Sequence, residues 1–102
     1  LQTLVIGDNV TSIGNSAYYH CSGMTSCTIG TGLTSIGNYA FVGCYVLTSV
    51  TVNALTPPKL GGSVFNNTND CPIYVPAASV DSYKSASGWS DYASRIQPIP
   101  NS

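Results

Sequence analysis

The chain has 102 residues, of which 43% are hydrophobic and only 7% are charged, whereas about 25% of the residues in an ordinary globular domain carry a charge. The net charge is −1 and no run of either sign occurs, so the sequence lacks the basic surface by which proteins bind nucleic acid or an anionic membrane. No apolar stretch approaches the roughly 18 residues of a membrane span, and the uncharged Ser, Thr, Asn and Gly residues that must keep the chain in solution favour an exported protein.

The first segment of the chain alternates in the manner of a β-strand. Leu1, Leu4 and Ile6 are apolar and are separated by Thr3 and Val5, which is the periodicity of a strand with one buried face. The chain opens inside this pattern, without a methionine and without the charged-then-apolar start of a signal peptide. We therefore expect a piece of a longer protein, with any export signal or anchor outside it.

This segment is the start of a repeat. Residues 1–23 read LQTLVIGDNVTSIGNSAYYHCSG and residues 24–46 read MTSCTIGTGLTSIGNYAFVGCYV, with the block TSIGN intact in both. A third copy covers residues 47–70, with one residue inserted at Pro57-Pro58. A fixed period of about 20–50 residues is typical of solenoids and other repeat architectures, so we assign residues 1–70 to leucine-rich repeats.

Each copy begins with a strand, and a single strand cannot bury its apolar side alone. Copies must therefore stack about 4.8 Å apart into a parallel sheet over one continuous core. Glycines such as Gly7 and Gly14 allow sharp bends, and the outer segments NSAYYHC and NYAFVGC direct an aromatic residue inward. The sequence predicts a β-rich α/β repeat solenoid, with the sheet on the concave face and one short helical or 3₁₀ turn per repeat on the convex face.

Two asparagines recur after the second turn of successive copies. Asn15 and Asn38 each follow a turn glycine, where an amide can satisfy backbone groups that a tight coil leaves unpaired. We expect both to support the backbone rather than to hold a ligand.

The repeat pattern changes from Asp70 onward. Residues 71–102 are predicted to form a C-terminal cap. Cys71, Ile73 and Val75 still alternate, between Pro72 and Pro76. Because proline cannot donate a hydrogen bond to a neighbouring strand, it is typical of sheet edges. We therefore expect this to be the last strand of the sheet, at its edge.

A short helix is predicted next, from Val80 to about Ser87, with Ser79 as its N-cap and Gly88 at its end. The prolines at 98 and 100 are expected to end regular structure. Terminal repeats of a solenoid must cover the open end of the core. Trp89, Tyr92 and Ile96 are the apolar residues expected to do so, while Val80, Tyr83 and Ala86 are expected near one face of the helix.

The LxxLxI strand, the TSIG turn and the AFxGC outer segment together resemble the BspA-like leucine-rich repeats of bacterial surface proteins. Residues 71–96 resemble the C-terminal cap found on many of them. Met24 and Cys27 depart from the pattern, because the family has leucine at these positions. The resemblance implies a bacterial protein that is secreted or anchored at the outer membrane, and adhesion to host matrix proteins or to other cells.

Residues that carry chemistry are few and scattered. Cys21, Cys27, Cys44 and Cys71 show no CxxC spacing and His20 is the only histidine, so zinc is not expected. Stacked equivalents such as Cys21 and Cys44 have parallel side chains, which do not readily adopt the dihedral angle of a disulfide. We expect free thiols that pack as small hydrophobic groups.

Catalysis is not expected either. The acidic residues lie singly, which leaves no pair of carboxylates for glycoside hydrolysis. His20 stands next to Cys21, but no carboxylate recurs nearby to orient it as a base for a nucleophile. The sequence predicts a protein that is not an enzyme and has neither metal nor cofactor.

The outward-facing strand positions form the candidate concave-face binding surface. They are polar without charge and end in a tyrosine, an amphipathic ring that anchors many interfaces. Alternatively, Ser and Thr only solvate the open face of a sheet. Sugar-binding surfaces usually present aromatic platforms, and only Tyr74 offers one here. The candidate residues are Thr3, Val5, Ser26, Thr28, Ser49, Thr51 and Tyr74.

We expect a non-enzymatic binding or adhesion module whose partner is a host matrix or cell-surface protein. The alternatives are a structural spacer of a surface protein and a carbohydrate-binding solenoid with a glycan ligand. The strand over residues 1–6 has an unpaired outer edge, and such edges recruit partners. Self-association through this edge is therefore expected as well.

Overall fold

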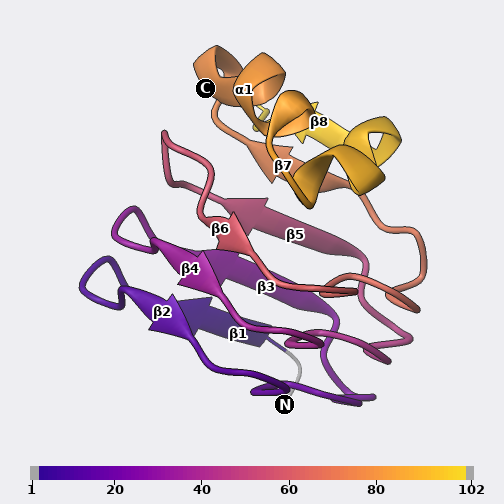
Figure 1. The fold of residues 1–102 in the computed structure, drawn as a ribbon. Coiled ribbons are helices and arrows are strands. Elements are labelled where there is room, and N and C mark those ends of the chain that lie inside the picture. The colour runs from indigo at the N-terminus through magenta and orange to yellow at the C-terminus, as the bar shows by residue number, and fades with distance from the viewer. Residues whose placement is uncertain (1–2, 101–102) are drawn as a thin grey trace.

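The computed structural model describes residues 3–100 and shows a solenoid of stacked coils (Figure 1). Leu1 and Gln2, where the first strand was expected to begin, lie outside the described residues. One wall of the solenoid is a parallel five-stranded sheet in the order β1-β3-β5-β7-β8. Its strands are β1 Thr3–Ile6, β3 Ser26–Ile29, β5 Ser49–Val52, β7 Ile73–Val75 and β8 Ile96–Pro98.

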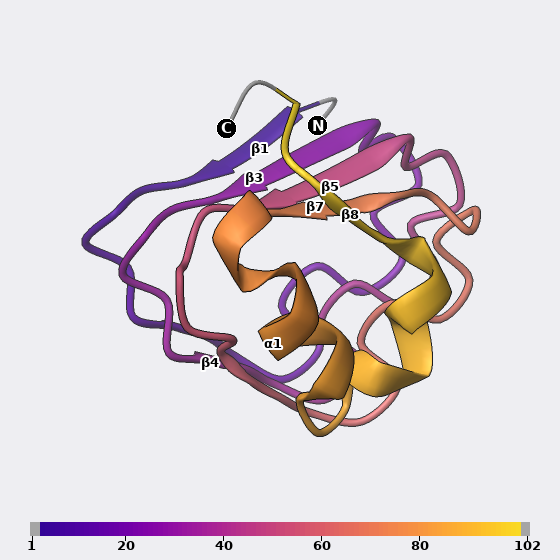
Figure 2. The ribbon, with the colours of Figure 1, turned by 90° about the horizontal axis from the view of Figure 1, so that it is seen from above.

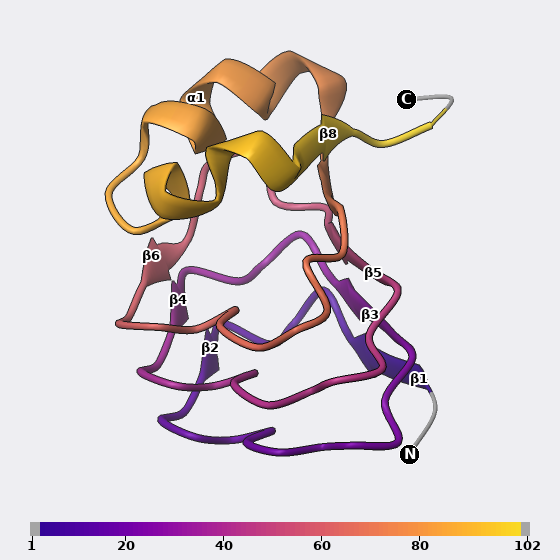
Figure 3. The ribbon, with the colours of Figure 1, turned by 90° about the vertical axis from the view of Figure 1, so that its right-hand side faces the viewer.

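A smaller parallel sheet, β2-β4-β6, forms the second wall. Figure 3 shows it opposite the first sheet, with the helical segments over one end of the stack. The strands of this wall are β2 Ser12–Ile13, β4 Ser35–Ile36 and β6 Lys59–Leu60. The helical segments are the 3₁₀ helix η1 Ala77–Ser79, the α-helix α1 Val80–Ser85 and the 3₁₀ helix η2 Trp89–Arg95.

The strand register confirms the repeat. Thr28 pairs with Thr51, one period of 23 residues away. In the second sheet Ser35 pairs with Lys59, so the offset between these paired residues is one residue longer than the period. The additional residue of the third copy therefore lies between Val52 and Lys59.

The core lies between the walls and runs the length of the stack. Inward strand positions such as Cys27, Val50 and Ile73 are buried, and the residues between them are not. Seen along the stack, the five-stranded sheet closes one side of the coil and the cap helices lie over its interior (Figure 2). The predicted solenoid with one continuous core is confirmed.

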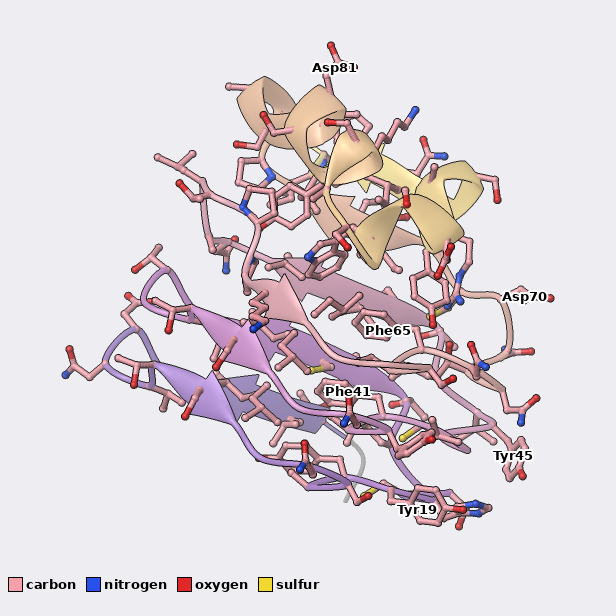
Figure 4. The ribbon with its side chains drawn as sticks, in the orientation of Figure 1. Tyr19, Phe41, Tyr45, Phe65, Asp70 and Asp81 are labelled. Atoms are coloured by element: carbon pink, nitrogen blue, oxygen red, sulfur yellow. The ribbon has the colours of Figure 1, made fainter. Side chains whose placement is uncertain are left out.

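A column of aromatic rings passes through this core. The rings of Tyr18 and Phe41 stack with centroids 5.4 Å apart, and those of Phe41 and Phe65 with centroids 5.6 Å apart. Phe41 and Phe65 both point inward from successive coils (Figure 4). Trp89 and Tyr92 of the cap close the column, at 5.7 and 5.5 Å from the Phe65 ring.

The third wall, which we call the turn wall, consists of residues 15–20, 38–43 and the equivalent residues of the third copy. The expected helical or 3₁₀ turns take the form of single turns here. The Tyr19 N–H donates within its own coil to Ser16 O at 3.2 Å, whereas the Tyr18 N–H donates to Ala40 O of the next coil at 2.8 Å. Because alternate N–H groups leave the coil, no continuous helix forms.

The recurring asparagines support the backbone, as expected. Asn15 Oδ1 accepts a hydrogen bond from the Asn38 N–H at 2.8 Å, and Asn38 Oδ1 accepts one from the Gly62 N–H at 2.7 Å. The glycine before Asn38 allows the two coils to approach this closely. A Cβ atom at Gly37 would lie 2.5 Å from the Asn15 backbone nitrogen.

The prediction that β7 is the edge strand was wrong, because β8 pairs with it in parallel and becomes the edge. The flanking prolines do not prevent this. Pro72 lies outside β7 and its carbonyl accepts a hydrogen bond from the Val50 N–H at 3.1 Å, while the Ile99 N–H donates to Val75 O at 2.9 Å. Regular structure accordingly continues to Pro98.

The cap helix is shorter than predicted and begins differently. α1 ends at Ser85 rather than near Ser87. Ser79 occupies the N-cap position but makes no capping hydrogen bond, because its hydroxyl donates to Leu55 O at 2.7 Å. Gly88 takes a positive φ of 83° and reverses the chain into η2.

Side chains of the cap replace the coil that would follow the third copy. The Tyr83 hydroxyl donates to Ala54 O at 2.6 Å, and the Trp89 indole N–H donates to Pro58 O at 2.8 Å. Burial raises the pKa of Tyr83, which keeps this hydroxyl protonated. Trp89, Tyr92 and Ile96 are buried, so the prediction that they cover the open core is confirmed.

We predict that Gly37→Ala destabilises the fold, because its Cβ would overlap the Asn15 backbone. Overpacking of this kind typically costs about 1–3 kcal/mol, measurable as a lower urea midpoint of unfolding. Gly62→Ala is the matched control, since its Cβ would find no atom closer than 3.7 Å. Equal midpoints for the two variants would contradict the close-approach explanation.

Candidate functional site

The structure brings the candidate concave-face residues together on the outer face of the five-stranded sheet. Their neighbours along each strand point into the core, so these side chains point away from it. The register aligns them in two adjacent rows. One row contains Val5, Thr28, Thr51 and Tyr74, and the other contains Thr3, Ser26 and Ser49.

This outer face is uncharged and partly shielded. Thr28, Thr51 and Tyr74 are half-buried, whereas Val5 at the edge strand is 69% exposed. The Ser26 hydroxyl donates to Thr3 Oγ1 at 3.3 Å. The hydroxyls can donate and accept hydrogen bonds, but no acid or base among these residues could activate one of them as a nucleophile.

Gln97 was not predicted from the sequence to belong to this face. Gln97 on β8 pairs with Tyr74 and is exposed, so it extends the longer row by one strand. This strand was not predicted, because the prolines at 98 and 100 led us to expect that regular structure had ended. Its apolar neighbour Ile96, predicted to be buried, was the available signal.

A second exposed feature lies on the turn wall, which carries Tyr19 and Tyr39, and just beyond it at Tyr45. Tyr19, Tyr39 and Tyr45 have about half of their surface exposed, at 52%, 50% and 52%, and Figure 4 shows Tyr19 and Tyr45 at the outer margin of the coils. The His20 ring contacts two of them, with its centroid 4.1 Å from that of the Tyr19 ring and 5.8 Å from that of the Tyr45 ring. The expectation that only Tyr74 offers an aromatic platform holds for the sheet face and not for the molecule.

Only a weak sequence signal pointed to these exposed tyrosines. In the outer segments one aromatic position per copy packs toward the core, where Tyr18 is partly buried and Phe41 is buried, so the additional tyrosines of these segments were left for the surface. One aromatic residue per copy was expected to point inward, and no direction was assigned to the others.

The cysteines are free thiols, as expected, and three of them are buried. Burial raises the pKa of Cys27 to about 12 and also raises the pKa of Cys44. Burial raises the pKa of Cys71 as well, although the Arg95 guanidinium 3.5 Å from its sulfur acts in the opposite direction. A thiol that holds its proton in this way is a poor nucleophile.

Over residues 3–100, which the structure describes, no three His, Cys, Asp or Glu side chains gather where they could hold a metal ion. No helix within the same residues has the length and apolar character needed to cross a membrane.

Comparison with known proteins identifies the repeat. The family model described as "BspA type Leucine rich repeat region (6 copies)" matches residues 1–87. That range covers the three copies, β7, η1 and the whole of α1. No curated protein matches the chain.

Stability should depend on pH through Cys27. Burial raises its pKa from 9.0 to about 12, so the folded protein holds this proton at pH values where the unfolded chain releases it. Its contribution to the free energy of unfolding is therefore fully present below pH 9.0 and is lost as the pH rises toward about 12.

Replacing the thiol tests this dependence. In Cys27→Val the free energy of unfolding, measured with urea at steps across that alkaline range, should fall less steeply than in the unsubstituted chain. Identical slopes would show that Cys27 does not contribute.

Proposed function

The chain belongs to the BspA-type leucine-rich-repeat family, and from that premise we propose that it is a non-enzymatic binding or adhesion module of a secreted or cell-surface bacterial protein. Leucine-rich-repeat domains generally mediate protein interactions. The observation that carries the proposal is the outer face of the five-stranded sheet, where the residues named above form two continuous uncharged rows across adjacent strands.

The shape of this face favours a protein partner over a small molecule. The rows run across neighbouring parallel strands, which are about 4.8 Å apart, and they form a surface rather than an enclosed cavity. Tyr74 near the cap and Val5 at the other edge supply apolar contact area, while the hydroxyls between them supply hydrogen bonds. Standard protein interfaces bury about 800 Å² per partner, which is more than strands of three or four residues offer, so we propose that neighbouring repeats of a longer protein contribute most of the contact.

The chemistry of the surface suits an exposed location. With 7% charged residues, the protein is kept in solution by hydroxyl and amide groups, whose interactions are insensitive to salt compared with those of ion pairs. We propose a host matrix or cell-surface protein as the ligand. Such a contact would depend on packing and neutral hydrogen bonds rather than on electrostatic steering.

Two other functions make different predictions. A structural spacer needs only the core and the cap, so its function would tolerate charge on the sheet face. A carbohydrate-binding solenoid would use aromatic platforms, and Tyr74 is the one such residue on this face within the described chain.

We predict that Thr28→Lys combined with Thr51→Lys weakens attachment of chain-coated beads to a basement-membrane extract or to a cell layer by about tenfold or more. Each lysine would place a charge without a partner at the centre of the interface, and tenfold corresponds to about 1.4 kcal/mol. Thr31→Lys combined with Thr56→Lys is the matched control, because both threonines are exposed in loops away from the sheet face.

The two pairs carry the same charge change, so a difference between them reports position. Equal attachment by all three proteins would exclude the sheet face and favour the spacer. Thermal unfolding of each variant separates a lost contact from a lost fold.

We also propose that the chain self-associates through the β1 edge, by docking of a second copy. Within residues 3–100, β1 pairs with β3 and with no other strand. The first coil also leaves space where later coils are packed, since a Cβ atom at Gly7 or Gly14 would meet nothing within 4 Å, whereas one at Gly37 would overlap the preceding coil. Unpaired edges of this kind recruit partners.

Sedimentation velocity at rising protein concentration tests this association. Val5→Lys should abolish it, because lysine on an edge strand prevents edge pairing. Thr51→Lys, in the same row but on an interior strand, should not. A monomer at every concentration for the unsubstituted chain would rule out the edge contact.

A further inference from the structure

The exposed tyrosines of the turn wall border a groove, which we call the turn-wall groove. It has a volume of about 410 Å³, within the range of about 300–1,000 Å³ that is usual for ligand sites. It crosses successive coils, because its side chains come from equivalent positions of the repeat. Its walls include Tyr19, Tyr39, Val42, Ser63, Asn66 and Asn67.

The lining combines aromatic faces with neutral polar groups. Tyr19 and Tyr39 are each about half exposed, at 52% and 50%, and Asn66, Asn67 and Ser63 are exposed beside them. No residue that lines the groove carries a charge. The groove therefore suits a ligand that has apolar faces and many hydroxyl groups but no formal charge.

One amide of the groove is held in place by the cap. The Tyr92 hydroxyl donates to Asn66 Oδ1 at 3.0 Å and accepts the Phe65 N–H at 3.3 Å. With its oxygen engaged, the Asn66 amide presents its NH₂ group as the donor. A donor whose orientation is fixed in advance costs less entropy when a ligand binds.

Tyr39 occupies a backbone conformation that tyrosine rarely adopts. Its φ is 60°, and the equivalent residues in the neighbouring coils are Ser16 and Ser63, at 56° each. The conformation therefore belongs to the repeat, and it costs on the order of 1 kcal/mol for a residue other than glycine. Serine fills this position in the other copies, so the fold does not require an aromatic ring there.

We infer that the turn-wall groove binds a neutral oligosaccharide. A sugar ring has a face of C–H groups that stacks on an aromatic ring, whose face is electron-rich. Its rim of hydroxyls matches the amides of Asn66 and Asn67 and the hydroxyl of Ser63. The site lies on a different wall from the sheet face, so it stands independently of the protein-binding proposal.

The test uses the whole chain labelled with ¹⁵N and titrated with cellotriose, chitotriose and maltotriose as probes. At least one probe should shift backbone signals of residues 16–19, 39–42 and 63–67 while leaving those of β3 and β5 unchanged. No shift with any of the three, or shifts confined to the sheet face, would overturn the inference.

Three variants locate the site. Tyr19→Ala combined with Tyr39→Gly removes both rings and should weaken binding of the responding probe by about tenfold or more, as loss of two aromatic contacts implies. Glycine at position 39 also accepts the positive φ, so the variant should fold. Tyr45→Ala is the matched control, since this tyrosine is equally exposed, at 52%, but does not line the groove.

Unchanged affinity in the double variant, or equal loss in the control, would also overturn the inference. The lysine pair on β3 and β5 separates the two proposals, because it should abolish attachment to matrix or cells and leave oligosaccharide binding intact.

Discussion

Each coil of this protein depends on the next coil for its backbone hydrogen bonds. The chain has almost no helix before the cap, so N–H and C=O groups cannot be satisfied within one coil, and leaving them buried without partners would be costly. Pairing between strands satisfies the backbone N–H and C=O groups of the two sheet walls. On the turn wall every second N–H crosses to the neighbouring coil, and at the corner an asparagine oxygen takes the place of a carbonyl.

The same dependence explains the cap. The third copy has no fourth copy to complete it, and its polar groups receive side-chain partners instead. The Tyr92 hydroxyl accepts the Phe65 N–H, where in the preceding coil the Phe41 N–H donates to a carbonyl of the next repeat. Arg95 donates to Cys71 O at 2.8 Å and to Thr68 Oγ1 at 2.8 Å. Because a guanidinium has several N–H donors, it can satisfy acceptor groups that the backbone of a following coil would otherwise satisfy.

The sequence predicted what is periodic and missed what is not. The strands, their register and the asparagine ladder follow from spacing, because a fixed offset of 23 residues places equivalent residues in contact. β8 was missed because proline was given more weight than the alternation at Ile96. The exposed tyrosines and Gln97 were missed because neither repeats, and a residue that occurs once carries no period from which its direction can be inferred.

The contact between Asn38 and its neighbours has a consequence for how such proteins can change over time. Asn38 accepts from the coil after it and donates its own N–H to the coil before it, so it recognises only adjacent copies. A gene duplication that inserts one whole copy between two neighbouring copies would recreate both contacts. The cap would still contact only the final copy. The solenoid can therefore lengthen or shorten by whole units without any compensating substitution, and the area of its walls can be selected separately from its stability.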